Sequence, residues 1–207
     1  LKNNSTVILD YAHTPDALKT CLANLKQQFP DKKIILLFGC GGNRDKDKRA
    51  KMGKIADNFS DKIYLTDDNP RFENPKQIRK DIRKGINKKR VIEISDRSKA
   101  IIEAVKDLNT GEILLVAGKG HEKIQDLGKK KIFFSDKKII LRSIKKKNLN
   151  LFTSTKLNLI KELSGKKEFP KISSLKKVTI NSREVKKNDI FFAIKGNKND
   201  GNKFISQ

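Results

Sequence analysis

Over the first two thirds of the chain, short apolar runs alternate with longer segments in which apolar residues recur every three or four positions. The short runs have the length of buried strands, and the longer segments have the spacing of helices that pack one face on a sheet. Strands and helices that alternate in this way predict an α/β fold with a doubly wound, mostly parallel, Rossmann-like sheet. The expected strands are residues 7–9, 34–38, 63–65, 91–94 and 113–116, with helices between them and a last helix that ends near residue 144. Residues 132–134 fit an additional edge strand.

The alternation stops at residues 145–150, a polar run that contains three lysines and two asparagines. Such a run is typical of a linker or a solvated helix end, and we expect a linker at 147–152 between a first domain, 1–146, and a second, 153–207. The second domain is expected to be a small α/β unit with a helix near 157–163 and strands at 178–180 and 190–194. Because the chain starts with Leu1 and this unit is short, we expect a piece of a longer protein with its second domain truncated.

Composition narrows the classes of partner. The formal net charge is +24, but 39 of the 48 basic residues are lysines scattered along the whole length, without an RNA-binding aromatic pattern or zinc-finger spacing. We therefore predict no nucleic-acid partner and keep nucleic-acid binding only as a minor alternative. Cys21 and Cys40 are the two cysteines and indicate neither a disulfide framework nor a metal cluster. No signal peptide or membrane-length apolar run occurs, which predicts a cytoplasmic protein without a membrane partner.

Four polar loops follow expected strands, and the carboxyl ends of parallel strands meet at one rim of a sheet. The first loop carries Asp10 and His13, and the second is a Gly-rich turn that leads to Arg44. The third is Asp68-Asn69-Pro70-Arg71, and the fourth runs from Gly118 through His121 to Glu122. Guanidinium groups suit carboxylates, and carboxylates suit ammonium groups, so this set could hold a small zwitterion.

Each of these loops also has a plainer interpretation. Taken singly, Asp68-Asn69-Pro70-Arg71 favours an ordinary Asx-type turn with a solvated arginine. A structural role and a ligand role for His121 are equally compatible with the sequence. The sequence has no Gly-x-x-x-x-Gly-Lys-Ser/Thr segment, no nucleophile elbow and no zinc-binding helix. The first domain is therefore predicted to bind an amino-acid-like ligand near a phosphate group, with no catalytic residue and no metal ligand of its own.

Taken together, the four loops resemble the C-terminal domain of the Mur ligases. The resemblance rests on residues 10–18, 38–46, 67–71 and 117–122, which have the order and spacing of the family motifs over residues 1–146. Asp68-Asn69-Pro70-Arg71 is similar to the form found in the members that add diaminopimelate, whereas the lysine-adding members differ at its last position.

The resemblance implies an ATP-dependent amide ligase of peptidoglycan synthesis. In the diaminopimelate-adding members ATP phosphorylates the carboxylate of UDP-N-acetylmuramoyl-L-alanyl-D-glutamate, and the amine of meso-diaminopimelate attacks the acyl phosphate. The implied diaminopimelate-binding residues are Arg44, Asp68, Asn69, Pro70, Arg71, Gly118 and Glu122, with Asp10 and His13 on the ATP side. The family binds ATP phosphates and Mg²⁺ mainly through a central domain, which this sequence lacks, so the chain is expected to be inactive by itself.

Residues 153–207 resemble the N-terminal, UDP-sugar-binding domain of a Mur ligase. The similar segments are 178–183 and 189–196, and Ser182 is the implied nucleotide contact. An N-terminal domain after a C-terminal one suggests a tandem fusion to a second ligase, in particular the D-Ala-D-Ala-adding one. The alternative function from another class is a non-catalytic module that binds an amino acid or a nucleotide on a Rossmann-like sheet.

Overall fold

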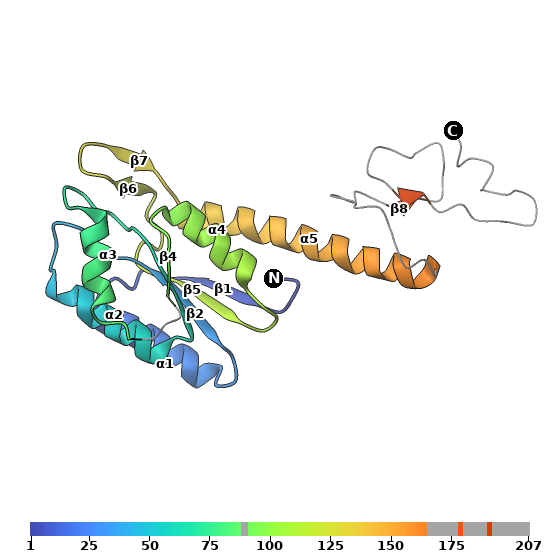
Figure 1. Ribbon diagram of the computed structural model, residues 1–207, viewed down its shortest axis with the longest axis horizontal. Coiled ribbons are helices and arrows are strands. Elements are labelled where there is room, and N and C mark those ends of the chain that lie inside the picture. The colour runs from blue at the N-terminus through green and yellow to red at the C-terminus, as the bar shows by residue number, and fades with distance from the viewer. Residues whose placement is uncertain (88–90, 165–177, 180–189, 192–207) are drawn as a thin grey trace, which may run out of the picture. The chain divides into compact units, whose positions relative to one another are not determined.

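The computed structural model describes residues 1–87, 91–164, 178–179 and 190–191 (Figure 1). The chain divides into two compact units, Leu1–Leu149 and Asn150–Gln207, and each is considered by itself. In the part of the chain that the structure describes, no helix has the length and apolar character needed to cross a membrane.

A five-stranded parallel sheet forms the centre of the first unit. Its order is β1-β5-β2-β3-β4, so that β2 is the central strand, β3 lies on one side of it, and β5 lies between it and β1. Leu36 in the middle of β2 lies opposite Leu115 of β5 and Ile63 of β3. The predicted α/β fold with a mostly parallel sheet is confirmed. The strands are β1 (Thr6–Leu9), β2 (Ile34–Phe38), β3 (Lys62–Leu65), β4 (Val91–Glu93) and β5 (Ile113–Val116).

Helices cover both faces of this sheet because alternate strand residues point to opposite sides. In β2, Leu36 belongs to one apolar cluster, whereas Ile35 and Leu37 belong to the other. The first cluster is completed by α1 (Pro15–Gln28), α2 (Asp47–Phe59) and α3 (Pro75–Arg83). The second is completed by α4 (Arg97–Asp107) and by Ile140 of α5 (Asp136–Ser164).

Helix caps fix where the loops after the strands end. The Thr14 hydroxyl accepts a hydrogen bond from the backbone N–H of Ala17, and Pro15 takes the first helical position of α1. Asn74 and Asp96 cap α3 and α4 in the same way. Side-chain caps of this type satisfy N–H groups that have no partner inside the helix. Each cap therefore sets the length of the polar loop that precedes it.

The expected edge strand at 132–134 is wrong in its placement. Strand β7 (Lys131–Phe133) pairs antiparallel with β6 (Ile124–Asp126) in a separate two-stranded hairpin. Strand β6 was not predicted, because three residues of mixed polarity carry no periodic signal. The hairpin matters for function because β6 follows directly on the fourth polar loop.

The expected linker at 147–152 is helical instead. Helix α5 runs without interruption from Asp136 to Ser164, through the region where a helix end, a linker and a second helix were expected. Lys147 donates from its ammonium to the carbonyl oxygens of Val105 (3.0 Å) and Lys106 (2.8 Å) at the end of α4. The assignment of 153–207 to a separate domain stays a prediction. Of that segment beyond α5, the structure describes β8 (Val178–Thr179) and β9 (Ile190–Phe191), which pair in parallel.

Candidate amino-acid-binding site

The four predicted polar loops meet at the carboxyl ends of the strands. They surround a cavity of about 540 Å³, so the expected convergence on one rim is confirmed. The predicted site residues that line it are His13, Arg44, Asp68, Asn69, Arg71, Gly118 and Glu122; the other lining residues are Tyr11, Thr14, Pro15, Gly39, Cys40, Gly41, Asp45 and Lys48.

The loop after β3 brings an amide, a carboxylate and a guanidinium to this cavity. Asp68 and Asn69 are buried, and the Asp68 carboxylate accepts a hydrogen bond from the Asn69 backbone N–H (2.7 Å). Arg71 has a left-handed backbone conformation (φ 51°), and its Nη1 donates to the Gly42 carbonyl (2.7 Å). Pro70 is not among the lining residues, but its carbonyl would lie 2.0 Å from a Cβ at Gly42. Pro70 thus shapes the loop, and the close approach requires glycine at position 42.

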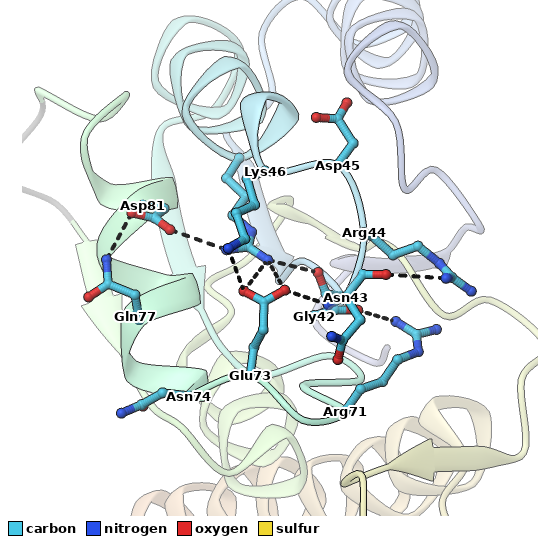
Figure 2. A network of polar contacts seen from close by, with 12 residues as sticks. Gly42, Asn43, Arg44, Asp45, Lys46, Arg71, Glu73, Asn74, Gln77 and Asp81 are labelled. Atoms are coloured by element: carbon cyan, nitrogen blue, oxygen red, sulfur yellow. Dashed lines mark hydrogen bonds and ion pairs between the residues drawn. The ribbon is translucent and has the colours of Figure 1, made fainter.

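A second guanidinium comes from the loop after β2. Arg44 is exposed, and its Nη1 donates to the Asn43 carbonyl (3.2 Å). Figure 2 shows the side chains of Arg44 and Arg71 extending to the same side of their loops. Both therefore present positive charge to the cavity, as the binding of a carboxylate requires.

Buried Arg49 holds these two loops together, a role that no sequence motif marks. Its Nη2 donates to both carboxylate oxygens of Glu73 (3.0 and 2.9 Å), and its Nη1 donates to Asp81 (3.2 Å). Glu73 also accepts a hydrogen bond from the backbone N–H of Asn43. Partial burial raises the pKa of Glu73, but the hydrogen bonds from Asn43 and Arg49 outweigh it and the pKa is lowered. An ionised Glu73 therefore links α2, the Arg44 loop and the Arg71 loop.

The fourth loop places Glu122 against Asn69. Gly118 has φ 110°, and a Cβ there would lie 3.0 Å from the Asp68 carboxylate, so this position demands glycine. Lys119 has no exposed surface, and its ammonium donates to Asn69 and Glu122. Burial raises the pKa of Glu122, but Lys119, Asn69 and the charge of Arg71 lower it further than burial raises it. The cavity therefore contains an ionised carboxylate opposite its guanidinium groups.

The hairpin supplies two site residues that were not predicted. The Gln125 side chain donates to the Asp68 carbonyl (2.7 Å), and the Asp126 backbone N–H donates to the Asn69 side-chain oxygen (3.0 Å). The Asp126 carboxylate lies 3.9 Å from the Arg71 guanidinium. Strand β6 thus holds the loop after β3 by hydrogen bonds from residues that do not line the cavity. No sequence signal marked these residues, because their strand was not expected.

Asp10 and His13, the two residues predicted to lie on the ATP side, border different hollows of the surface. His13 lines the cavity, and its ring packs 4.7 Å from that of Tyr11, which in turn lies 5.4 Å from His121. Asp10 instead borders a shallow hollow along α1, and its carboxylate accepts the backbone N–H of Ala12 (2.7 Å). Ser182 lies outside the described residues.

The cavity lacks an activated thiol. Cys40 borders it, but burial raises the pKa of this thiol to about 12, so it stays protonated near neutral pH. A protonated thiol is a poor nucleophile. The arrangement is therefore suited to binding a charged small molecule rather than to covalent attack on one.

Comparison with known proteins relates the larger part of the chain to a described family. Residues 1–120 match the sequence model of the domain described as "Mur ligase, glutamate ligase domain". The chain belongs to the Mur ligase family. The resemblance inferred from the four loops is thus confirmed at the level of the family, whereas the proposed fusion to a second Mur ligase is not covered by this match.

Several Mur ligases with a named substrate are similar to the chain. The UDP-N-acetylmuramoyl-L-alanyl-D-glutamate–2,6-diaminopimelate ligase of Rickettsia rickettsii is 49% identical over 144 residues, which are 69% of this chain and 30% of that protein. The ligase of the same name from Prochlorococcus marinus subsp. pastoris is 50% identical over 143 residues, 69% of this chain and 28% of that protein. A solved structure of a ligase with this name is 37% identical with a TM-score of 0.66, and the match covers 70% of this chain and 30% of that one. The chain thus spans about 30% of the length of these relatives.

Mur ligases are ATP-dependent, which raises the question of a magnesium site. Among residues 1–87 and 91–164 and the two short strands beyond, no group of three or more histidine, cysteine or acidic residues is placed to hold a metal ion.

Proposed function

We propose that this chain is the amino-acid-binding part of an ATP-dependent ligase that adds meso-diaminopimelate to UDP-N-acetylmuramoyl-L-alanyl-D-glutamate in peptidoglycan synthesis. One observation carries the proposal: guanidinium groups from two loops and a carboxylate with a lowered pKa line the same cavity. Meso-diaminopimelate has two carboxylates and two ammonium groups, and one of its amines must be free to attack. The relatives from Rickettsia rickettsii and Prochlorococcus marinus, 49% and 50% identical to this chain, bear the name of the diaminopimelate ligase.

The charges suggest how the amino acid would be oriented. Arg44 and Arg71 would bind a carboxylate, and Glu122 would bind the ammonium group at the same distal end. Asp68 and Asn69 would shape the pocket, and Gly118 would allow the ligand to approach the backbone closely. The other amine would then face the open side of the cavity, where an acyl phosphate could be delivered.

The ATP phosphates and Mg²⁺ would be bound outside this chain. The sequence has no phosphate-binding Gly-x-x-x-x-Gly-Lys-Ser/Thr loop, and the positioning of the γ-phosphate depends on such a loop. His13, at the edge of the cavity, and Asp10 would contact the nucleotide from this side. The chain by itself would then bind the amino acid without forming the amide bond.

The second part of the proposal concerns residues 153–207. Their sequence pattern supports an N-terminal, UDP-sugar-binding domain of a second Mur ligase, in particular the D-Ala-D-Ala-adding one, with Ser182 as a nucleotide contact. The two activities of such a fusion would be consecutive.

Binding of meso-diaminopimelate and L-lysine to the chain, measured by calorimetry, tests the proposal. Lysine lacks the distal carboxylate, so it could not form the ion pair with Arg71 that diaminopimelate would form. We expect lysine to bind about 10- to 100-fold more weakly, the equivalent of the roughly 1.5–3 kcal/mol of a charged hydrogen bond. Arg71→Gln should reduce the affinity for diaminopimelate by a similar factor and leave that for lysine nearly unchanged.

Arg83→Gln provides the matched control, because Arg83 is exposed on α3 and does not line the cavity. This variant should bind both amino acids as the unmodified chain does. Equal affinities of the unmodified chain for diaminopimelate and lysine would contradict the proposed substrate.

A further inference from the structure

Lys119 forms a closed triangle of polar contacts with two residues of the cavity. Its ammonium lies 2.8 Å from the Asn69 side-chain oxygen and 2.8 Å from Oε2 of Glu122. The third side is the hydrogen bond from the Asn69 side-chain nitrogen to the same Oε2 (3.1 Å). A third acceptor, the carbonyl of Ile124, is also 2.8 Å from the ammonium. All three donor positions of the lysine are therefore used.

The burial of Lys119 makes these contacts obligatory. The side chain is 0% exposed, although lysine is almost never fully buried unless it is paired. A buried ammonium without acceptors would be strongly unfavourable, so the fold requires Asn69 and Glu122 to stay in place around it. Lys119 itself does not line the cavity, whereas both of its side-chain partners do. It therefore acts behind the surface that a ligand would meet.

The triangle also decides which atom of Glu122 faces a ligand. Both Lys119 and Asn69 donate to Oε2, and among the described residues no donor is placed on Oε1. A ligand ammonium that binds Glu122 would therefore meet Oε1. Because the Asn69 oxygen accepts from Lys119 and from Asp126, its amide orientation is fixed as well.

We propose that Lys119 is a positioning residue of the amino-acid site, which holds Asn69 and Glu122 as one unit and balances the charge of Glu122. This inference rests on the proposed function for the identity of the ligand, but its effect on Glu122 can be measured without one. Besides Lys119, the charged groups near Glu122 are Arg71 from the loop after β3 and, buried beneath the site, Arg97 at the start of α4. These two would remain in a Lys119 variant.

The test replaces Lys119 by methionine, which keeps the length of the side chain and removes its charge. Without the ammonium, the pKa of Glu122 should rise, because Lys119 is the strongest of the groups that lower it. A carboxyl-detected NMR titration of the free chain measures this. At pH 7 the affinity for meso-diaminopimelate should fall about tenfold or more, the effect of losing a charged hydrogen-bond partner. When the pH is lowered, binding should be lost at a higher pH than in the unmodified chain, because Glu122 with a raised pKa is protonated at a higher pH.

Lys123→Met is the matched control, since Lys123 adjoins Glu122 in sequence but is exposed. It should change neither the titration of Glu122 nor the affinity. An unchanged Glu122 titration in Lys119→Met overturns the inference, and so does a shifted titration with unchanged affinity at every pH. If the unmodified chain binds no diaminopimelate, the proposed ligand is wrong, while the Glu122 titration still decides whether Lys119 controls this carboxylate.

A second measurement covers the case in which Lys119→Met does not fold. In the unmodified chain the buried, fully hydrogen-bonded ammonium should give a resolved ¹H–¹⁵N signal that exchanges slowly with water. In Glu122→Gln this signal should move, because one of its three acceptors loses its charge. A Lys119 ammonium signal that is lost to exchange like those of exposed lysines, or that does not respond to Glu122→Gln, would overturn the inference.

Discussion

Arg49 illustrates how a single residue outside the cavity can determine its shape. Arg49 is located on α2, and its guanidinium forms ion pairs with two carboxylates, those of Glu73 and Asp81. Because Glu73 also accepts the Asn43 backbone N–H, the loop that carries Arg44 depends on an ion pair whose members do not line the cavity. Hydrogen bonds between a guanidinium and a carboxylate are stronger than those between neutral groups.

The ion pair predicts a dependence of stability on pH. Glu73→Gln should lower the free energy of unfolding at pH 7 by about 1–3 kcal/mol, because buried Arg49 loses a charged partner. The pKa of Glu73 is lowered in the folded chain, so its contribution is present above the ordinary glutamate pKa of about 4.3 and is lost as the pH falls through the lower folded value. Urea unfolding at a series of pH values measures this: the difference between the two proteins should shrink below about pH 4.

Glu103→Gln is a suitable comparison for this experiment. Glu103 pairs with Lys106 at 3.1 Å on the surface of α4, and such exposed pairs contribute little, about 0–1 kcal/mol. A loss in Glu73→Gln no larger than in Glu103→Gln would show that the Arg49 ion pair does not stabilise the loops.

At the scale of elements, a fully buried ion pair connects three segments beneath the site. Arg97, the first residue of α4, donates to both oxygens of Asp136, the first residue of α5, at 2.9 and 2.7 Å. It also donates to the carbonyl of Ala117, which leads from β5 into the fourth loop (3.0 Å). The pair therefore sets where α5 starts relative to the loop that contains Lys119 and Glu122.

Removing one member of this ion pair should destabilise the fold. Arg97→Met should lower the free energy of unfolding by about 3–5 kcal/mol, because Asp136 is left as a buried, uncompensated charge. The double variant Arg97→Met/Asp136→Leu should lose less than the single one, since it removes both charges. Thermal or denaturant unfolding of the three proteins measures the difference. A double variant that is less stable than Arg97→Met would contradict this explanation.

Elements that the sequence predicted well differ physically from those that it did not. The inner strands β2, β3 and β5 are short apolar runs with nearly every residue buried, whereas the edge strands β1 and β4 are only partly buried. The helices between the strands have caps such as Thr14. The hairpin gave no such signal, because Gln125 is buried through a hydrogen bond to a backbone carbonyl rather than through apolar contact. The segment expected to be a linker is helical because lysine favours helices, and because no glycine or proline interrupts the chain between Asp136 and Ser164. The boundary between the two compact units nevertheless lies within this segment, after Leu149.

At the scale of the whole first unit, the site follows from topology. The loops that hold Arg44, Asp68, Arg71 and Glu122 come from three different strands, and parallel pairing places all their carboxyl ends on one rim. This much could be predicted because it depends only on strand order and direction. The contacts of Arg49, Lys119 and Asp126 could not, because they depend on which side chains meet across loops that are distant in sequence.

The burial of Lys119 has a practical consequence in a chain so rich in lysine. An amine-acylating reagent reaches only ammonium groups that meet solvent, so the native chain should be labelled at Lys123 and left unlabelled at Lys119. Lys119 would react only when the fourth loop opens, and its labelling rate, followed by mass spectrometry of the digested chain, would report how often that happens. Equal labelling rates at the two lysines would show that the loop opens freely. The labelling rate of Lys119 measured with a bound amino acid, compared with the rate without one, would then show whether the ligand changes how often the fourth loop opens.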